Sequence, residues 1–511
     1  MLKLKEDIEK IAVLGLDALS WNYFEKLAKV GAVPNLKCIA SKSIKLLLHA
    51  YPPVTPPSWT SILTGVNPGK HGIFAFDYMD KKSWRQKLYT ATDLKHPRIH
   101  EMLGMINIPS IMINPIPGYP IIPIKNTYVI SGMLGTPKIF YHPKTLEKYQ
   151  KILGEPPKVF RGRNLSDFAV KWENVLNKYL TIVEDLVNFD WKIFWLNVEL
   201  PDVMLHLFPN LLYEDAKEER KLFTLIDIMA KILSENSDVF ILVSDHGFTA
   251  YHAKVSINDI LFRCGYVRTT IEENKLKEVI DLRPWTTIHD YDERKKKAYI
   301  KLPYKLVQLL NSNQLKPLKR IMKSISKLTL KKDVKIKMPN VDPAASIAFM
   351  PSRSSYGIYV KSPQLIDEII NILNATKGIK WAKRREEIFT GPFISKAPDI
   401  MICPDFNEKY ILSGNKLLGK VIIKGNFADH HPIGLFSIYS KSDDVALPLK
   451  DGGIIENYEV TPLILYLLRL PLPIDTDSKL VKEMQVKTTE KYKKMWEIIK
   501  RIHRVRIKIQ T

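Results

Sequence analysis

The sequence has few cysteines and no recognisable secretion signal. Only three of its 511 residues are cysteines, Cys38, Cys264 and Cys403, and they lie too far apart to form a CxxC motif. Such a set provides no disulfide framework and is typical of proteins in a reducing compartment. Segment 1–17 carries charges ahead of its apolar run and lacks a signal-peptide cleavage pattern. These absences predict a cytoplasmic protein.

The chain also lacks a run that reads as a membrane span. Segment 102–124 has no charged residue and is long enough to cross a bilayer. Five prolines interrupt it, and a helix broken that often would leave backbone groups unpaired in lipid. We therefore predict no transmembrane segment here, but a buried strand within 108–114 followed by a proline-rich loop.

Acidic residues are outnumbered by basic ones, 54 against 77, which gives a net charge of +23. A charge of this sign favours anionic partners, such as phosphate-containing substrates, nucleic acid or acidic lipid headgroups. Lysine is dense in segment 271–340, which we predict to be an insertion or cap. The oligomeric state leaves no signal in the sequence.

The C-terminal segment 479–511 is predicted to be a basic tail that contains an amphipathic helix. Residues 487–508 hold nine Lys or Arg against two Glu. Apolar residues of this segment fall at helical spacing on one face: Tyr492, Met495, Trp496, Ile499 and Ile502. Two interpretations stay open, a helix packed on the core and a weak contact with anionic surfaces.

Short apolar runs alternate with amphipathic helical patterns along most of the chain. This alternation predicts an α/β fold with a mostly parallel central sheet and helices on both of its faces. The predicted buried strands are 11–16, 193–198 and 239–244. The predicted helices are 21–30, 214–234 and 462–470. Segments 1–270 and 341–478 would together form one discontinuous catalytic domain.

All three predicted strands lead into residues that can bind metal. These residues are Asp17, Asp202, His206, Asp245 and His246. Because the carboxyl ends of parallel strands meet at one edge of a sheet, we expect the five side chains to converge. Carboxylates and imidazoles suit zinc, manganese or iron. Five such groups exceed what one zinc ion takes, and two ions suit displacement at phosphorus.

Segment 51–73 contains a hydroxyl at the start of a predicted helix. Pro56 and Pro57 suit the first turn of a helix, which places Thr55 at or next to the N-cap. Positive potential at a helix N-terminus favours an anion there, so Thr55 could attack a bound phosphate. Further along, His430 and His431 are predicted to lie in a loop between apolar runs, where one of them could complete the metal site.

Together these motifs resemble the alkaline phosphatase superfamily, and within it the type I phosphodiesterase/nucleotide pyrophosphatase family. The similar segments occur in the family's order: GLDAL (15–19), PPVTPPSWTSILTGVNPGKHGIF (52–74), PDVMLH (201–206), SDHGF (244–248) and HHPIGLF (430–436). The resemblance implies an alkaline-phosphatase-like fold and a hydrolase that acts on small phosphate esters or nucleotides. It also implies two divalent ions, foremost Zn²⁺, with Mn²⁺, Fe²⁺ or Mg²⁺ as alternatives.

The resemblance also implies a role for each matching residue. Thr55 would be the nucleophile and would form a phosphothreonine intermediate. One metal would be surrounded by Asp17, Thr55, Asp245 and His246. The other would be surrounded by Asp202, His206 and His430, since the family places proline two residues after the ligand. Ser58 stands where the family usually has a phosphate-contacting asparagine, so we expect it to bind substrate while nucleotide preference stays open.

Other functions of the same fold remain open from the sequence. A sulfatase would need a Cys-x-Pro-Ser-Arg pattern, which is missing around Thr55. A phosphomutase would normally use serine as nucleophile, and a phosphotransferase would pass the phosphoryl group to another acceptor. A catalytically inactive protein that binds nucleic acid or an anionic surface is a further alternative, motivated by the net charge.

Overall fold

The structure is a computed structural model that describes most of the chain. The described residues are 8–132, 138–154, 164–270, 299–301, 335–337, 340–442, 449–480 and 486–510. Most of the predicted insertion 271–340 therefore lies outside the described residues. Two short strands within it, β12 (Tyr299–Lys301) and β13 (Lys335–Lys337), pair in parallel.

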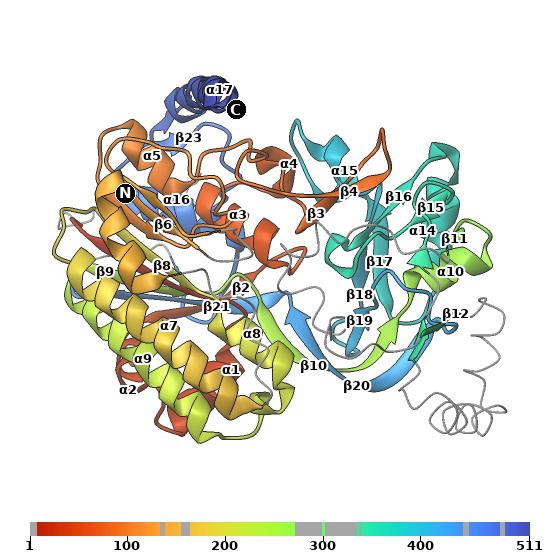
Figure 1. Cartoon of the computed structure of the whole chain (residues 1–511), viewed down its shortest axis with the longest axis horizontal. Coiled ribbons are helices and arrows are strands. Elements are labelled where there is room, and N and C mark those ends of the chain that lie inside the picture. Colours follow the sequence, from red (N-terminus) through yellow and green to blue (C-terminus); the bar gives the residue numbers. More distant parts are fainter. Residues whose placement is uncertain are drawn as a thin grey trace.

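A nine-stranded sheet forms the centre of the larger lobe (Figure 1). Its order is β22 (Ile454–Glu456), β2 (Ile44–His49), β21 (Ile433–Ser440), β9 (Val239–Val243), β1 (Ile11–Leu16), β8 (Ile193–Val198), β5 (Ser110–Ile113), β6 (Thr127–Ser131) and β7 (Phe140–His142). Strands β21 and β7 run antiparallel to their neighbours, and the other neighbouring pairs are parallel. The predicted mostly parallel sheet is thus confirmed.

Helices cover both faces of this sheet, because its central strands are apolar on both sides. Along β1, alternate side chains enter two different hydrophobic cores, Leu14 into one and Val13 into the other. The first core is covered by α1 (Trp21–Lys29), α2 (Pro34–Ser41), α7 (Leu165–Leu186), α8 (Leu200–Leu207) and α9 (Lys217–Glu235). The second is covered by α3 (Thr55–Thr64), α5 (Ile99–Met105), α16 (Val460–Leu467) and α17 (Lys491–Gln510).

A smaller lobe has a hydrophobic core of its own. It contains a four-stranded sheet in the order β15 (Ala348–Phe349), β16 (Gly357–Val360), β18 (Ile400–Pro404) and β17 (Ile379–Arg384). Helices α10 (Ile257–Arg263) and α14 (Ile366–Asn374) pack in the same core. Two long antiparallel strands, β10 (Gly247–Val255) and β20 (Ile422–His431), run between the two lobes (Figure 1). The sequence did not predict this third core, which belongs to the smaller lobe.

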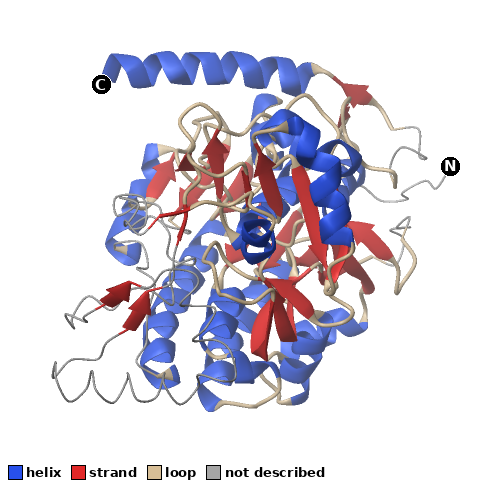
Figure 2. Cartoon of the chain, turned by 90° about the vertical axis from the view of Figure 1, so that its right-hand side faces the viewer, coloured by secondary structure: helices blue, strands red, loops and turns tan. Residues whose placement is uncertain are grey.

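The predicted C-terminal helix is α17, which lies along the outside of the larger lobe (Figure 2). Tyr492 and Trp496 are buried in the second core, and Met495 and Ile499 pack against it. Ile502, which the helical pattern placed on the same face, is 50% exposed. The difference arises because the helix extends beyond the surface on which its first turns pack.

Segment 102–124 contains no membrane-spanning helix. Its first residues finish α5, and the predicted strand forms as β5, followed by an irregular proline-rich stretch. In the part of the chain that the structure describes, no helix has both the length and the apolar character that a bilayer crossing requires.

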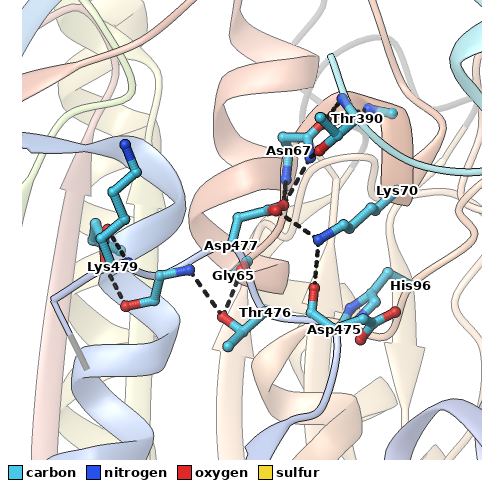
Figure 3. A network of polar contacts seen from close by, with 12 residues as sticks. Gly65, Asn67, Lys70, His96, Thr390, Asp475, Thr476, Asp477 and Lys479 are labelled. Atoms are coloured by element: carbon cyan, nitrogen blue, oxygen red, sulfur yellow. Dashed lines mark hydrogen bonds and ion pairs between the residues drawn. The ribbon is translucent and has the colours of Figure 1, made fainter. Parts of the chain in front are cut away.

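A network of polar contacts holds the C-terminal end of α3 (Figure 3). Asp477 accepts hydrogen bonds from the backbone and the side chain of Asn67, both at 2.8 Å, and pairs with Lys70 at 2.5 Å. The hydroxyl of Thr476 donates to the carbonyl of Gly65, the C-cap of α3. Helix α3 is therefore anchored by a segment more than 400 residues later in the chain.

Candidate active site

The residues predicted to bind metal converge at the carboxyl ends of three adjacent strands. Asp17 follows β1, and Asp245 and His246 follow β9. Asp202 and His206 lie on α8, which begins just after β8. Since β9, β1 and β8 are neighbours in the sheet, their ends form one edge, as the sequence predicted.

His430 reaches this edge from a different element than expected. It lies at the end of strand β20, opposite Phe248 of β10, and not in a loop. The loop prediction was wrong because the polar sequence around it pairs with a distant strand. His431, one residue on, packs against Phe406 and takes part in neither cluster of candidate ligands.

The side chains form two clusters, each with ligand atoms within 4.8 Å of one another. In the first cluster, His246 Nε2 lies 3.6 Å from Asp17 Oδ1 and 3.2 Å from Asp245 Oδ2. In the second, His430 Nε2 lies 3.1 Å from Asp202 Oδ1 and 2.9 Å from His206 Nε2. This division is the one that the resemblance implied.

Hydrogen bonds on the outer side of two rings fix which nitrogen faces each cluster. His430 Nδ1 lies 2.8 Å from the carbonyl of Pro53, and His246 Nδ1 lies 3.1 Å from the carbonyl of Gly247. A carbonyl oxygen only accepts, so each Nδ1 carries the hydrogen and each neutral ring has its lone pair on Nε2. Those lone pairs face carboxylate oxygens, an arrangement that a cation between them would stabilise.

The carboxylates of the site also fit a metal. Asp17 Oδ1, Asp202 Oδ1 and Asp245 Oδ2 are buried and have no hydrogen-bond partner within the described residues. Burial raises the pKa of Asp245 to about 7, and burial together with the charge of Asp245 raises the pKa of Asp17 well above its usual range. Burial lowers the pKa of His246, which favours the neutral ring that binds metal. Buried acceptors of this kind are costly unless a cation satisfies them.

Thr55 is the first residue of α3 and faces the first cluster. Val54 is the N-cap, and Thr55 Oγ1 lies 3.4 Å from His246 Nε2. Pro56 and Pro57 follow within the first turn, as predicted, and they have no N–H to donate. The positive end of the helix therefore acts on an anion mainly through its dipole.

Ser58 lies one turn into α3 and is buried. Its hydroxyl donates to the carbonyl of Pro52 at 3.2 Å. The single hydroxyl hydrogen is thus directed at the chain that precedes the helix. Its predicted contact with substrate stays a prediction.

Two glycines, Gly15 and Gly247, allow other groups to pack closely at the edge of the sheet that carries the site. A side chain on Gly15 would lie 2.1 Å from Asn197 Oδ1 and 2.6 Å from the ring of Trp59. Because Gly15 has no side chain, the Trp59 ring can lie across β1, where its Nε1–H points to Asp17 Oδ2 at 3.4 Å. Gly247 similarly admits the carbonyl of Ile433 at a position that any side chain would occupy.

The sequence did not reveal two charged residues beside the second cluster. Arg353, from a short turn of the smaller lobe, forms an ion pair with Asp429, the residue before His430. Asp429 also accepts the backbone N–H of His430 at 2.9 Å. No motif surrounds Arg353, so no sequence signal could have pointed to it.

Comparison with known proteins agrees with this geometry. The sequence model of the type I phosphodiesterase/nucleotide pyrophosphatase family matches residues 11–359. No curated protein sequence matches the chain significantly.

Many solved structures are similar in fold, and two of them serve as examples. Phosphonoacetate hydrolase from Sinorhizobium meliloti 1021, in complex with phosphonoformate, is 16% identical, with 90% of this chain and 95% of that chain covered and a TM-score of 0.54. A variant of the alkaline phosphatase PafA is 12% identical, with 94% and 99% covered and a TM-score of 0.52. At these identities the similarity establishes the fold alone, and it is the alkaline-phosphatase-like fold.

Fold, site and family match together define a metal-dependent hydrolase of phosphate esters. Since the family model covers well over half of the sequence, the chain belongs to the type I phosphodiesterase/nucleotide pyrophosphatase family. The family, fold and enzyme class expected from the sequence are thereby confirmed.

Proposed function

We propose that the protein is a phosphodiesterase or nucleotide pyrophosphatase that uses two divalent ions and Thr55 as nucleophile. The observation that carries the proposal is the position of Thr55 Oγ1, 3.4 Å from His246 Nε2 and at the positive end of α3. Asp17, Asp245 and His246 would hold one ion together with Thr55. Asp202, His206 and His430 would hold the other.

When bound, the two ions would neutralise charge on the entering and departing oxygens of the reaction. Zn²⁺ suits a donor set of carboxylates and imidazoles, and Mn²⁺, Fe²⁺ and Mg²⁺ are the alternatives to test.

The reaction would proceed in two displacements at phosphorus. Thr55 Oγ1 loses its proton to solvent and forms a bond to phosphorus, while the bond between phosphorus and the ester oxygen breaks. The departing alkoxide takes a proton from water. A water molecule then loses a proton to solvent and bonds to phosphorus, while the bond between phosphorus and Thr55 Oγ1 breaks. Thr55 Oγ1 regains a proton from solvent, and the phosphate product leaves. The α3 dipole would stabilise the phosphoryl group next to Thr55 throughout.

The test is a screen of purified protein with each ion against aryl phosphomonoesters, aryl phosphodiesters, nucleotides and dinucleotides. We expect diesterase activity to exceed monoesterase activity. Thr55→Ala should abolish turnover and retain bound metal. Thr60→Ala is a matched control, because the Thr60 hydroxyl bonds to Pro56 within the same helix and should retain turnover.

Four results would contradict the proposal. Full turnover in Thr55→Ala would remove the nucleophile. Transfer of the phosphoryl group to added alcohols in preference to water would indicate a phosphotransferase, and transfer within one substrate a phosphomutase. A protein that neither binds nor responds to metal would be the inactive binding protein.

We also propose a weak contact between α17 and anionic surfaces. Its outward side presents the exposed side chains of Lys491, Lys494, Ile498, Arg501 and Ile502, a combination that suits the interface of an acidic membrane. Binding to vesicles that contain acidic lipid should fall with salt and with reversal of Lys491 and Arg501 to Glu. Reversal of Lys37 and Lys42, which belong to the opposite face of the sheet, is the control. Equal binding to neutral vesicles would refute the contact.

A further inference from the structure

Two basic side chains contact neighbouring positions on the same strand, close to the second cluster. Phe427 and Asp429 are two residues apart on β20, so their side chains lie on one face of the strand. Arg353 forms its ion pair with Asp429. Lys254 Nζ, from β10, lies 4.3 Å from the centre of the Phe427 ring. The two cations therefore gather over a short stretch of β20.

This pair of cations is coupled to the candidate metal site. Asp429 is covalently adjacent to His430 and accepts its backbone N–H. Tyr251, on β10, donates its hydroxyl to the His430 carbonyl at 2.6 Å.

Among the described residues, Lys254 is the cation of this pair that lacks a counter-ion. The Asp429 carboxylate already pairs with Arg353, and the charge of Asp202 also acts on Arg353. Lys254 has no ion pair or hydrogen bond to any described residue, and its Nζ lies over the Phe427 ring. Burial and the charge of Arg353 lower the pKa of Lys254 to about 8. A second anion would relieve this repulsion, and the Arg353 side chain, 35% exposed, is open to one.

We propose that Lys254 and Arg353 form a subsite for a second phosphoryl group of the substrate. The proposal rests on the proposed function, since the reacting phosphate would occupy the metal clusters. It specifies the substrate class as phosphate esters that carry another anionic phosphoryl group on the side of Asp202, His206 and His430. Asp429 positions the guanidinium, and its bond to His430 ties the subsite to the metal-binding ring.

The test compares three p-nitrophenyl phosphodiesters. One carries a phosphoryl group at a position remote from the reacting phosphate, the second carries a carboxylate there, and the third carries neither. The wild-type protein should prefer the phosphoryl ester by kcat/KM. Lys254→Met should reduce that preference about tenfold, the effect of one charge-assisted contact. Lys424→Met is the matched control, because Lys424 is an exposed lysine on β20, the strand that pairs with β10.

Arg353 is tested by the conservative change Arg353→Lys, because removal of its charge would leave the buried carboxylate of Asp429 unpaired. Arg353→Lys should also reduce the preference for the phosphoryl ester. An equal loss with all three esters would show a structural role and refute the subsite. The same preference in Lys254→Met and Lys424→Met would refute it as well. A preference for the carboxylate ester would reassign the subsite's ligand.

A second measurement separates failure of the subsite from failure of the proposed function. If the wild-type protein cleaves none of the esters, the proposed function fails. Calorimetric binding of inorganic pyrophosphate to the metal-loaded protein then still tests the subsite. We expect Lys254→Met to bind pyrophosphate about tenfold more weakly than Lys424→Met, and equal affinities would refute the proposal.

Discussion

The imidazole rings of His246 and His430 stack with their centroids 3.9 Å apart and their planes inclined by 21°. One ring follows β9 and belongs to the first cluster, and the other ends β20 and belongs to the second. Each ring is held from behind by a backbone carbonyl. The stack therefore fixes the two clusters side by side, although their residues come from separate strands.

Loss of a ligand from one cluster should release one ion and retain the other. Of the candidate metal ligands, His206 contacts Asp202 and His430, which both belong to the second cluster. We expect His206→Ala to bind about half as much metal per chain as the wild-type protein, because the first cluster stays complete. Elemental analysis of purified protein measures this. His431→Ala is the control, because His431 is next to His430 on β20 but belongs to neither cluster. A complete loss of metal from His206→Ala would contradict two separable sites.

Ser58→Ala should affect stability more than substrate affinity. The Ser58 hydroxyl is buried and donates its only hydrogen to Pro52, and phosphate oxygens only accept. We expect a loss of about 1 kcal/mol in the free energy of unfolding, the usual contribution of such a bond, with little change in KM. Denaturant unfolding and steady-state kinetics measure the two quantities. A KM raised without any loss of stability would instead establish the predicted substrate contact.

Asp475→Asn should destabilise the protein at neutral pH and lose this effect in acid. Asp475 is partly buried, which alone would raise its pKa, but its bond to His96 at 3.2 Å and the charge of that ring lower the pKa well below 3.8. At a pH between the lowered pKa of Asp475 in the folded protein and its ordinary pKa of 3.8 in the unfolded chain, the unfolded chain binds the proton and the folded protein does not. The stabilisation is therefore complete above about pH 4 and declines below it. Thermal unfolding across pH should show the Tm difference between the variant and the wild-type protein shrink in acid. A difference independent of pH would refute the ion pair's contribution.

Trp496→Ala should strongly destabilise the fold. The indole is fully buried between α17 and the second core. Truncation of a buried tryptophan costs about 3–5 kcal/mol through lost burial and the cavity that remains. Urea unfolding measures the change, and Ile498→Ala, on the exposed side of the same helix, should cost under about 0.5 kcal/mol. Similar costs for the two variants would show that α17 does not pack as described.

The sequence predicted the elements whose signals are local. Strands β1 and β8 begin and end where expected, because each is a continuous apolar run buried on both faces. The strand ends then placed Asp17, Asp202 and Asp245 at one edge. The helix predicted at 214–234 forms as 217–235, a shift at its ends that apolar spacing alone does not determine.

Features that depend on distant contacts could not be predicted. His430 looked like a loop residue because its strand pairs with β10, about 180 residues earlier in the chain. The core of the smaller lobe combines segments on both sides of 271–340, and Arg353 reaches the site only through that packing. Such contacts follow from tertiary structure, and one sequence carries no periodic pattern that reports them.

Helix α3 is held at both ends by chain that is synthesised late. At its front, the His430 ring bonds to Pro53, and at its rear, Thr476 and Asp477 bond to Gly65 and Asn67. A nascent chain that has left the ribosome only as far as the smaller lobe already contains Thr55 but lacks both of these anchors of α3. The proposed nucleophile therefore reaches its final position among the last parts of the protein, and a product that ends early would carry Thr55 without these two anchors.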